Sequence, residues 1–218
     1  MDKLINLDER LEMCASLVRE SARLADVGCD HAYLSISLLK SGKISFAVAS
    51  DINEKPLKSG EENARKYGVK NIEFRLGSGL REIKSEDKIT DVVIAGMGGE
   101  IISEIINESP LTKDESLNLV LQPMTKSEEL ISYLYENGFE ISKQKCVVSK
   151  GKCYTVISAF YSGKSTEIDE AFKYTGKLDL SDEINRRFIK TEIRHLENKS
   201  KGDSSLSAVI VKLKRVIV

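Results

Sequence analysis

Residues 139–161 read FEISKQKCVVSKGKCYTVISAFY, and this stretch decides the fold class of the chain. Two runs rich in β-branched and aromatic residues, 139–149 and 152–161, are separated only by Lys150 and Gly151. A two-residue connection that ends in glycine is typical of a β-hairpin, in which the strands are antiparallel. We therefore predict that the sheet of this protein ends in an antiparallel hairpin.

The segment before the hairpin alternates between short apolar runs and stretches of helical periodicity. Such strand-then-helix units predict a parallel sheet with helices on both faces. A parallel sheet that finishes in a hairpin is characteristic of the S-adenosylmethionine-dependent methyltransferase variant of the Rossmann architecture, whereas a dinucleotide-binding domain more often continues with a helical crossover. The further strands are predicted at 23–27, 44–50, 71–76, 90–95 and 118–122, and the helices near 6–20 and at 31–40, 54–67, 100–107 and 127–136.

The composition changes after Gly163. Residues 164–181 are polar, and two stretches of helical periodicity follow, 184–198 and 206–216, with a short loop at Lys201 and Gly202 between them. We expect an α/β fold with a seven-stranded, mostly parallel, Rossmann-like sheet and a small, coiled-coil-like helical domain at the C-terminus. The predicted domains are residues 1–162 and 163–218.

Composition excludes several classes of protein. The 218 residues carry 33 Lys/Arg and 34 Asp/Glu, a net charge of -1, which argues against binding to nucleic acid through overall charge. No apolar stretch is long enough to cross a bilayer, so we expect a soluble, cytoplasmic protein. Four cysteines without a C-x-x-C pair and only two histidines predict no metal site. The oligomeric state is not determined by the sequence, although a monomer is compatible with it.

The residues that follow the predicted strands indicate the ligand, because open α/β sheets bind ligands beyond the carboxyl ends of their strands. Gly28 allows a close backbone approach, and Asp51, 23 residues later, is placed to accept hydrogen bonds from ribose hydroxyls. The run GCDHAY (28–33) lacks the G-x-G-x-x-G pattern. Carboxylates at Asp26 and Asp30 would repel a pyrophosphate and favour a ligand with a cationic amino-acid end. The charges therefore favour S-adenosylmethionine over NAD.

Five segments resemble the bacterial tRNA (adenine-N1)-methyltransferases that act on adenine-22, the TrmK family. The segments are DVGCDHAYLSISLL (26–39), ASDINEKPLKSGEENARKYG (49–68), RLGSGL (75–80), IAGMGGEII (94–102) and LQP (121–123). The resemblance covers the Rossmann-like part and, loosely, the helical tail. It implies methyl transfer from S-adenosylmethionine to N1 of a tRNA adenine, and it implies the cofactor-binding residues Asp26, Gly28, Cys29, Asp51, Ile52, Asn53, Gly77, Ser78, Gly79, Gly96, Met97 and Gly98.

Three positions depart from the pattern of that family. Ser78 replaces an Asp that commonly binds the exocyclic amine of adenine, and a Ser would bind it more weakly. Ser35 stands where Pro is common, which we expect to affect only the entry of the helix. Met124 stands where Asn is frequent, which weakens any hydrogen-bonding role at that position.

The chemistry needs little acid–base catalysis, because N1 of adenine carries a lone pair at neutral pH and attacks without losing a proton. Alignment of the reactants is then the main contribution of the enzyme. The candidate catalytic residues are Asp30, His31, Tyr33 and Gln122. The alternatives are a helix-start role for His31, core packing for Tyr33 and local hydrogen bonding for Gln122.

The helical tail offers a surface for tRNA. Residues 163–218 carry 12 Lys/Arg and 9 Asp/Glu, whereas residues 1–162 carry 21 and 25. Arg186, Lys190 and Arg194 recur every four residues and form one basic stripe, our predicted tRNA-binding residues; the alternative is an ordinary solvated helix face. Two other functions stay open: a methyltransferase with another RNA or a small-molecule acceptor, and a non-catalytic RNA-binding module.

Overall fold

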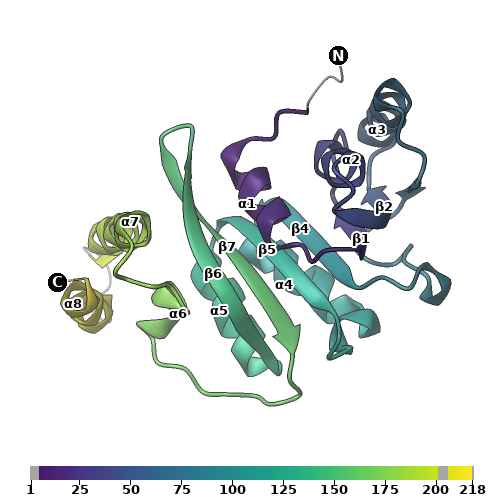
Figure 1. The fold of residues 1–218 in the computed structure, drawn as a ribbon. Coiled ribbons are helices and arrows are strands. Elements are labelled where there is room, and N and C mark those ends of the chain that lie inside the picture. The colour runs from purple at the N-terminus through teal and green to yellow at the C-terminus, as the bar shows by residue number, and fades with distance from the viewer. Residues whose placement is uncertain (1–4, 201–205, 218) are drawn as a thin grey trace.

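The computed structural model describes residues 5–200 and 206–217, and in these ranges it contains one seven-stranded sheet (Figure 1). The strand order is β3-β2-β1-β4-β5-β7-β6, and only the pairs that involve β7 are antiparallel. The predicted mostly parallel, Rossmann-like sheet with a terminal hairpin is thereby confirmed. The strands are β1 (Ala22–Val27), β2 (Ile44–Asp51), β3 (Ile72–Leu76), β4 (Asp91–Gly98), β5 (Asn118–Thr125), β6 (Phe139–Ser149) and β7 (Lys152–Tyr161).

Helices cover both faces of the sheet (Figure 1). Alternate residues of the central strands point to opposite faces, so that Val93 packs with helices α1 and α2, whereas Val92 and Ile94 pack with α4 and α5. The helices are α1 (Glu9–Leu17), α2 (Tyr33–Lys40), α3 (Glu54–Tyr67), α4 (Gly99–Glu108) and α5 (Ser127–Glu136), and two short 3-10 turns lie at Ser85–Asp87 and Pro110–Lys113.

The hairpin turn has the backbone that its sequence predicts. Lys150 and Gly151 both have positive φ, 49° and 79°, and Ser149 pairs with Lys152. This conformation matches the twist of antiparallel strands, and glycine adopts it without strain. The hairpin inserts β7 between β5 and β6, so the last strand in sequence is not the edge strand.

The main differences from the sequence prediction concern the boundaries of four elements. Strands β4 and β5 are longer than expected, because Met97 pairs with Pro123 and Gly98 with Thr125 after a register shift. The Gly-Met-Gly run is therefore the end of a strand and not a loop. Helix α2 begins at Tyr33 because Ala32 has a left-handed backbone, with φ 55°. Helix α1 ends at Leu17, since Val18 is extended.

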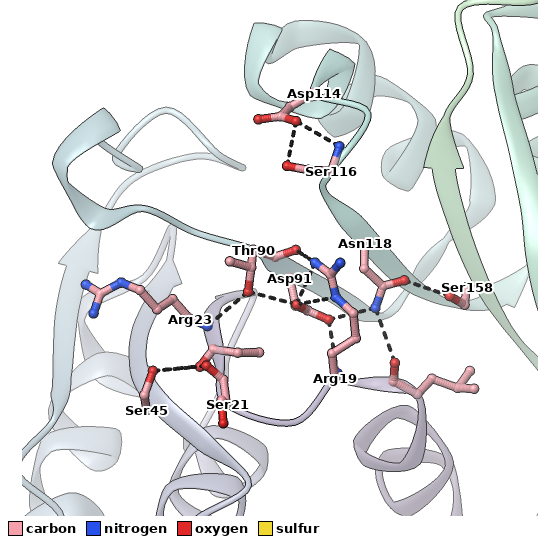
Figure 2. Close-up of polar contacts among 12 residues, drawn as sticks. Arg19, Ser21, Arg23, Ser45, Thr90, Asp91, Asp114, Ser116, Asn118 and Ser158 are labelled. Atoms are coloured by element: carbon pink, nitrogen blue, oxygen red, sulfur yellow. Dashed lines mark hydrogen bonds and ion pairs between the residues drawn. The ribbon is translucent and has the colours of Figure 1, made fainter.

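A polar cluster lies at the amino ends of the central strands (Figure 2). The ligand is predicted at the opposite, carboxyl ends of these strands. Asp91, the first residue of β4, is completely buried. It accepts hydrogen bonds from Nε of Arg19 (3.0 Å), Oγ1 of Thr90 (2.9 Å) and Nδ2 of Asn118 (2.7 Å). Arg19 precedes β1 and Asn118 is the first residue of β5. Asp91 therefore connects the N-terminal segment to β4 and β5.

The C-terminal helices are α6 (Phe172–Thr175), α7 (Glu183–Ser200) and α8 (Leu206–Val216). Helix α7 packs against both strands of the hairpin, α8 packs against α7, and α6 packs against α5 and α7 (Figure 1). Ile189, Ile193 and Leu213 form an apolar cluster that includes Cys146 of β6, and the backbone N–H of Cys146 donates to Oδ1 of Asn185 (2.9 Å). The expected loop at residues 201 and 202 lies outside the described residues. None of the helices in the described ranges has the length and apolar character needed to span a membrane.

Candidate active site

Two adjoining cavities lie at the carboxyl ends of β1, β2 and β4, where the sequence predicts the ligand. They have volumes of about 260 Å³ and 380 Å³ and share Gly28, Ala95 and Gly96 in their walls. The predicted residues Asp26, Cys29, Asp30, His31 and Tyr33 line the smaller cavity, and Asp51, Ile52, Asn53, Gly77, Ser78, Gly79 and Met97 line the larger one. Gly98 and Gln122 line neither.

Asp26 is the most unusual group of the smaller cavity. It is a buried carboxylate at the end of β1, and it accepts a hydrogen bond from Oγ of Ser35 (2.7 Å). Burial raises the pKa of Asp26 from 3.8 to about 6, although the hydrogen bonds from Ser35 oppose this shift. The sequence predicts that Ser35 affects only the entry of α2. In the structure its hydroxyl also holds the Asp26 carboxylate in place.

The loop after β1 wraps tightly around the smaller cavity. The N–H groups of Gly28 and Cys29 both donate to the carbonyl of Ser50, at 2.8 and 3.0 Å. Gly28 has φ 69°, and a Cβ at this position would lie 2.2 Å from Cε of Met97. The positive φ favours glycine at this position, and a larger residue would require the Met97 side chain to move, so the glycine backbone can approach both a ligand and the end of β4.

Asp30, His31 and Tyr33 form the outer rim of the smaller cavity. Nε2 of His31 lies 3.5 Å from Oδ1 of Asp30, and the rings of His31 and Tyr33 are 5.8 Å apart. Asp30 and His31 are exposed and Tyr33 is 39% exposed, which argues against core packing of this tyrosine. The rim thus presents a carboxylate, an imidazole and a phenol ring to any molecule that enters.

The larger cavity begins at the end of β2. Oδ1 of Asp51 accepts a hydrogen bond from the backbone N–H of Asn53 (2.9 Å), which orients the carboxylate. Ile52 and Ile101 also line this cavity and are 68% and 51% exposed, an apolar surface suited to the face of a base. The carboxylates of Glu104 and Glu108 on α4 lie in the same wall and were not anticipated.

Gln122 stands behind the cavities and does not face them. Its side chain is fully buried; Oε1 accepts from the backbone N–H of Gly96 (3.2 Å) and from Nη1 of Arg10 (3.0 Å), and Nε2 donates to the carbonyl of Pro123 (2.8 Å). These contacts match the alternative of local hydrogen bonding that the sequence left open. In this geometry Gln122 connects Arg10 with the ends of β4 and β5 behind the cavities.

Arg10 is a lining residue that the sequence analysis missed. It comes from the first turn of α1, 112 positions away from its partner Gln122. Asp8 caps the same helix by accepting from the N–H groups of Arg10 and Leu11, and it also binds the Arg10 guanidinium (2.6 Å). The cap by Asp8 fixes where α1 begins, but it does not indicate that Arg10 lines a cavity.

The three residues of the predicted basic stripe lie on α7 and differ in their contacts. Arg186 donates to the backbone carbonyls of Leu180 and Ser181, at 2.7 and 2.8 Å, so its charge holds the segment before α7. Lys190 and Arg194 are exposed. A cavity of about 540 Å³ lies between β5, the hairpin and α7. Its lining includes the cations Lys126, Lys152, Arg187 and Lys199, the carboxylates Glu128 and Glu192, and His195.

The charges of the two cavities fit the predicted cofactor. Asp26 is a buried carboxylate that lacks a cationic partner among the described contacts, and its ionised form is the natural partner of a ligand ammonium group. Asp51 is an acceptor suited to ribose hydroxyls, with an apolar surface beside it. In the described ranges, no group of three or more His, Cys, Asp or Glu side chains is arranged to hold a metal ion.

The fold and the site together define a methyltransferase domain. A family model described as a methyltransferase domain matches residues 7–157. The chain is 30% identical over 200 residues to the tRNA (adenine(22)-N(1))-methyltransferase of Bacillus subtilis, covering 89% of this chain and 83% of the relative. The chain belongs to this family of tRNA (adenine(22)-N(1))-methyltransferases.

A solved structure supports the same assignment over the full length. It is that of a Streptococcus pneumoniae protein proposed to be a tRNA (m1A22) methyltransferase, 29% identical, with a TM-score of 0.87, covering 98% of this chain and 100% of the other. The Streptococcus pneumoniae protein has also been solved in complex with S-adenosyl-L-methionine, with the same TM-score and coverage.

Proposed function

We propose that this protein transfers a methyl group from S-adenosylmethionine to N1 of adenine-22 in tRNA. The observation that carries the proposal is the pair of adjoining cavities at the carboxyl ends of β1, β2 and β4, with a buried carboxylate at one end and a strand-end carboxylate at the other. Asp26 serves the amino-acid end of the cofactor, and Asp51 serves its ribose.

The residues of this chain act by binding and orientation. The cofactor supplies a methyl group on a positively charged sulfur, and the ring nitrogen of adenine supplies the lone pair. Gly28 and Gly96 let the backbone lie close to the reacting centre, where the two cavities meet. Asp30, His31 and Tyr33 at the rim are placed to contact the target base, and no proton has to be removed before the attack.

The partner is tRNA, and the helical tail, residues 163–218, is the part that we assign to docking it; residues 1–162 form the cofactor domain. Lys190 and Arg194 are exposed and suited to phosphate contacts. Arg186 contributes by holding the start of α7, since its guanidinium binds backbone carbonyls. The enzyme then acts in the cytoplasm, where tRNA is found.

Two measurements test this function. Calorimetric titration with S-adenosylhomocysteine, the product form of the cofactor, is expected to show one binding site, and its absence would leave only a non-catalytic RNA-binding module. Transfer of labelled methyl groups is then compared between a tRNA with adenine-22 and the same tRNA with guanine-22. Incorporation into the first alone supports the proposal, whereas equal incorporation into both would assign a different acceptor.

A further inference from the structure

Two cysteines lie side by side on the hairpin. Cys146 of β6 pairs with Thr155, and Cys153 of β7 pairs with Val148, so the two cysteines are diagonal neighbours on the same face of the hairpin. Their side chains meet, since the thiol of Cys146 donates a hydrogen bond to the sulfur of Cys153. The hairpin therefore carries a pair of thiols in contact.

The two thiols differ in their access to small molecules. Cys146 is only 5% exposed and belongs to the apolar cluster beneath α7. Cys153 is partly exposed and lines the cavity of about 540 Å³ between β5, the hairpin and α7. Four Lys or Arg side chains and two carboxylates line this cavity, a balance of charge that favours a negatively charged molecule. A reagent that enters the cavity reaches Cys153 first.

The surroundings of Cys153 favour the thiolate, the nucleophilic form of a cysteine. The hydrogen bond from Cys146 and the charge of the Arg187 guanidinium lower the pKa of Cys153, although burial and the Glu192 carboxylate oppose this shift. Burial raises the pKa of Cys146 well above its usual range, so this thiol keeps its proton and acts as the donor. The other titratable groups around the pair are Lys126, Glu128, Lys152, Tyr154, Tyr174, Asp182, His195 and Lys199.

An accessible thiolate beside a second thiol is the arrangement of redox-active cysteine pairs. We propose that Cys146 and Cys153 form a redox site, which small anionic disulfides such as oxidised glutathione convert to an intramolecular disulfide. The thiolate of Cys153 attacks one sulfur of oxidised glutathione, the S–S bond of the reagent breaks, and one glutathione leaves as a thiolate. The sulfur of Cys146 then attacks Sγ of Cys153 and gives its proton to solvent, and the second glutathione leaves as a thiolate.

The position of the pair makes this disulfide reversible. Diagonal neighbours have Cα atoms about 7–8 Å apart, whereas a relaxed disulfide spans about 4–7 Å, so the bond strains the hairpin and is more easily reduced than a structural disulfide. Both cysteines also contact the first turn of α7. The thiol of Cys153 donates to the carbonyl of Ile184 (3.6 Å), and the N–H of Cys146 donates to Asn185. Oxidation removes the first of these donors and thus acts on the contact between the hairpin and α7.

Peptide mapping of the full chain tests the proposal. Trypsin cleaves after Lys150 and Lys152, so the two cysteines fall into separate peptides, residues 146–150 and 153–164. After incubation of the native protein with oxidised glutathione and blocking of the remaining thiols, a digest without reductant is expected to contain these two peptides joined. Excess reduced glutathione is expected to separate them again. Cys146→Ser is expected to stop at a glutathione bound to Cys153, and Cys153→Ser is expected to form no joined peptide.

The matched control is Cys14→Ala, which removes a buried thiol of α1 and is expected to leave the joined peptides unchanged. In the native protein Cys153 is expected to react at least about tenfold faster than Cys14 or Cys29. Absence of the joined peptides, their formation only in denaturant, or a link from Cys153 to Cys14 or Cys29 would overturn the proposal. The map of the unmodified protein decides this even where a variant does not fold, and it needs neither methyl donor nor tRNA, so its outcome is independent of the proposed function.

Discussion

Protonation of Asp26 should make both the stability of the protein and its affinity for the cofactor depend on pH. Burial raises the pKa of this carboxyl from 3.8 to about 6. A shift of about 2 units corresponds to about 3 kcal/mol. The pKa of Asp26 is raised on folding, so protonation of this carboxyl favours the folded, ligand-free protein. Its contribution to the free energy of unfolding is fully present below about pH 4 and is lost as the pH rises through about 6.

Binding of the cofactor should show the opposite dependence on pH, since the ligand ammonium pairs with the ionised form of Asp26. About one tenth of the Asp26 side chains are ionised at pH 5 and about nine tenths at pH 7, so the affinity for S-adenosylhomocysteine should rise about tenfold over this range. The α-amino group of the ligand stays mostly protonated below about pH 7. Each binding event at pH 5 should therefore release about 0.9 proton from Asp26.

Calorimetry in two buffers with different heats of ionisation measures this proton release directly. The comparison is between the unmodified protein and Asp26→Asn, because any other group that titrates in the same range is present in both. Ser35→Ala removes a hydrogen bond that lowers the pKa of Asp26 and should move the transition to higher pH. An identical pH profile in the unmodified protein and in Asp26→Asn would refute the reasoning.

Three further predictions concern other parts of the molecule. Asp51→Ala should lower the affinity for S-adenosylhomocysteine by about 1.5–3 kcal/mol in calorimetry, because a charged hydrogen-bond acceptor is lost; an unchanged affinity would show that Asp51 does not bind the ribose. Asp91→Ala should lower the free energy of unfolding by about 2–4 kcal/mol in a denaturant titration, because a buried carboxylate that accepts charge-assisted hydrogen bonds from Arg19, Thr90 and Asn118 is lost, while cofactor affinity is retained. Changing Lys190 and Arg194 together to Glu should weaken tRNA binding and reduce its salt dependence in a filter-binding assay without affecting cofactor binding, and full tRNA affinity would contradict a docking role for α7.

The sequence was most informative where local rules determine the structure. The hairpin 139–161 could be predicted to the residue, because its turn needs two positive φ angles and Lys150-Gly151 provides them. The edge of the sheet at which the cavities lie also followed from the order of strands and helices, since parallel strands bring their carboxyl ends together.

Contacts between distant segments could not be predicted in this way. Arg10 meets Gln122 only because α1 packs next to β5 and β7, and nothing in the sequence near Arg10 indicates this. The hydroxyl of Ser35 reaches Asp26 only through the left-handed backbone that precedes α2. Arg186 has the same helical spacing as Lys190 and Arg194, but its partners are carbonyls of the preceding loop, which periodicity does not reveal.

The proposed function requires that the methyl group is transferred to the ring nitrogen N1 of adenine-22. It is tested most directly by incubating the protein with S-adenosylmethionine and a tRNA transcript, digesting the RNA, and identifying and mapping the modified nucleoside by mass spectrometry. The expected product is 1-methyladenosine at position 22 and at no other position. N6-methyladenosine, a methyl group at another position, or unmodified tRNA after incubation with cofactor-binding protein would contradict it.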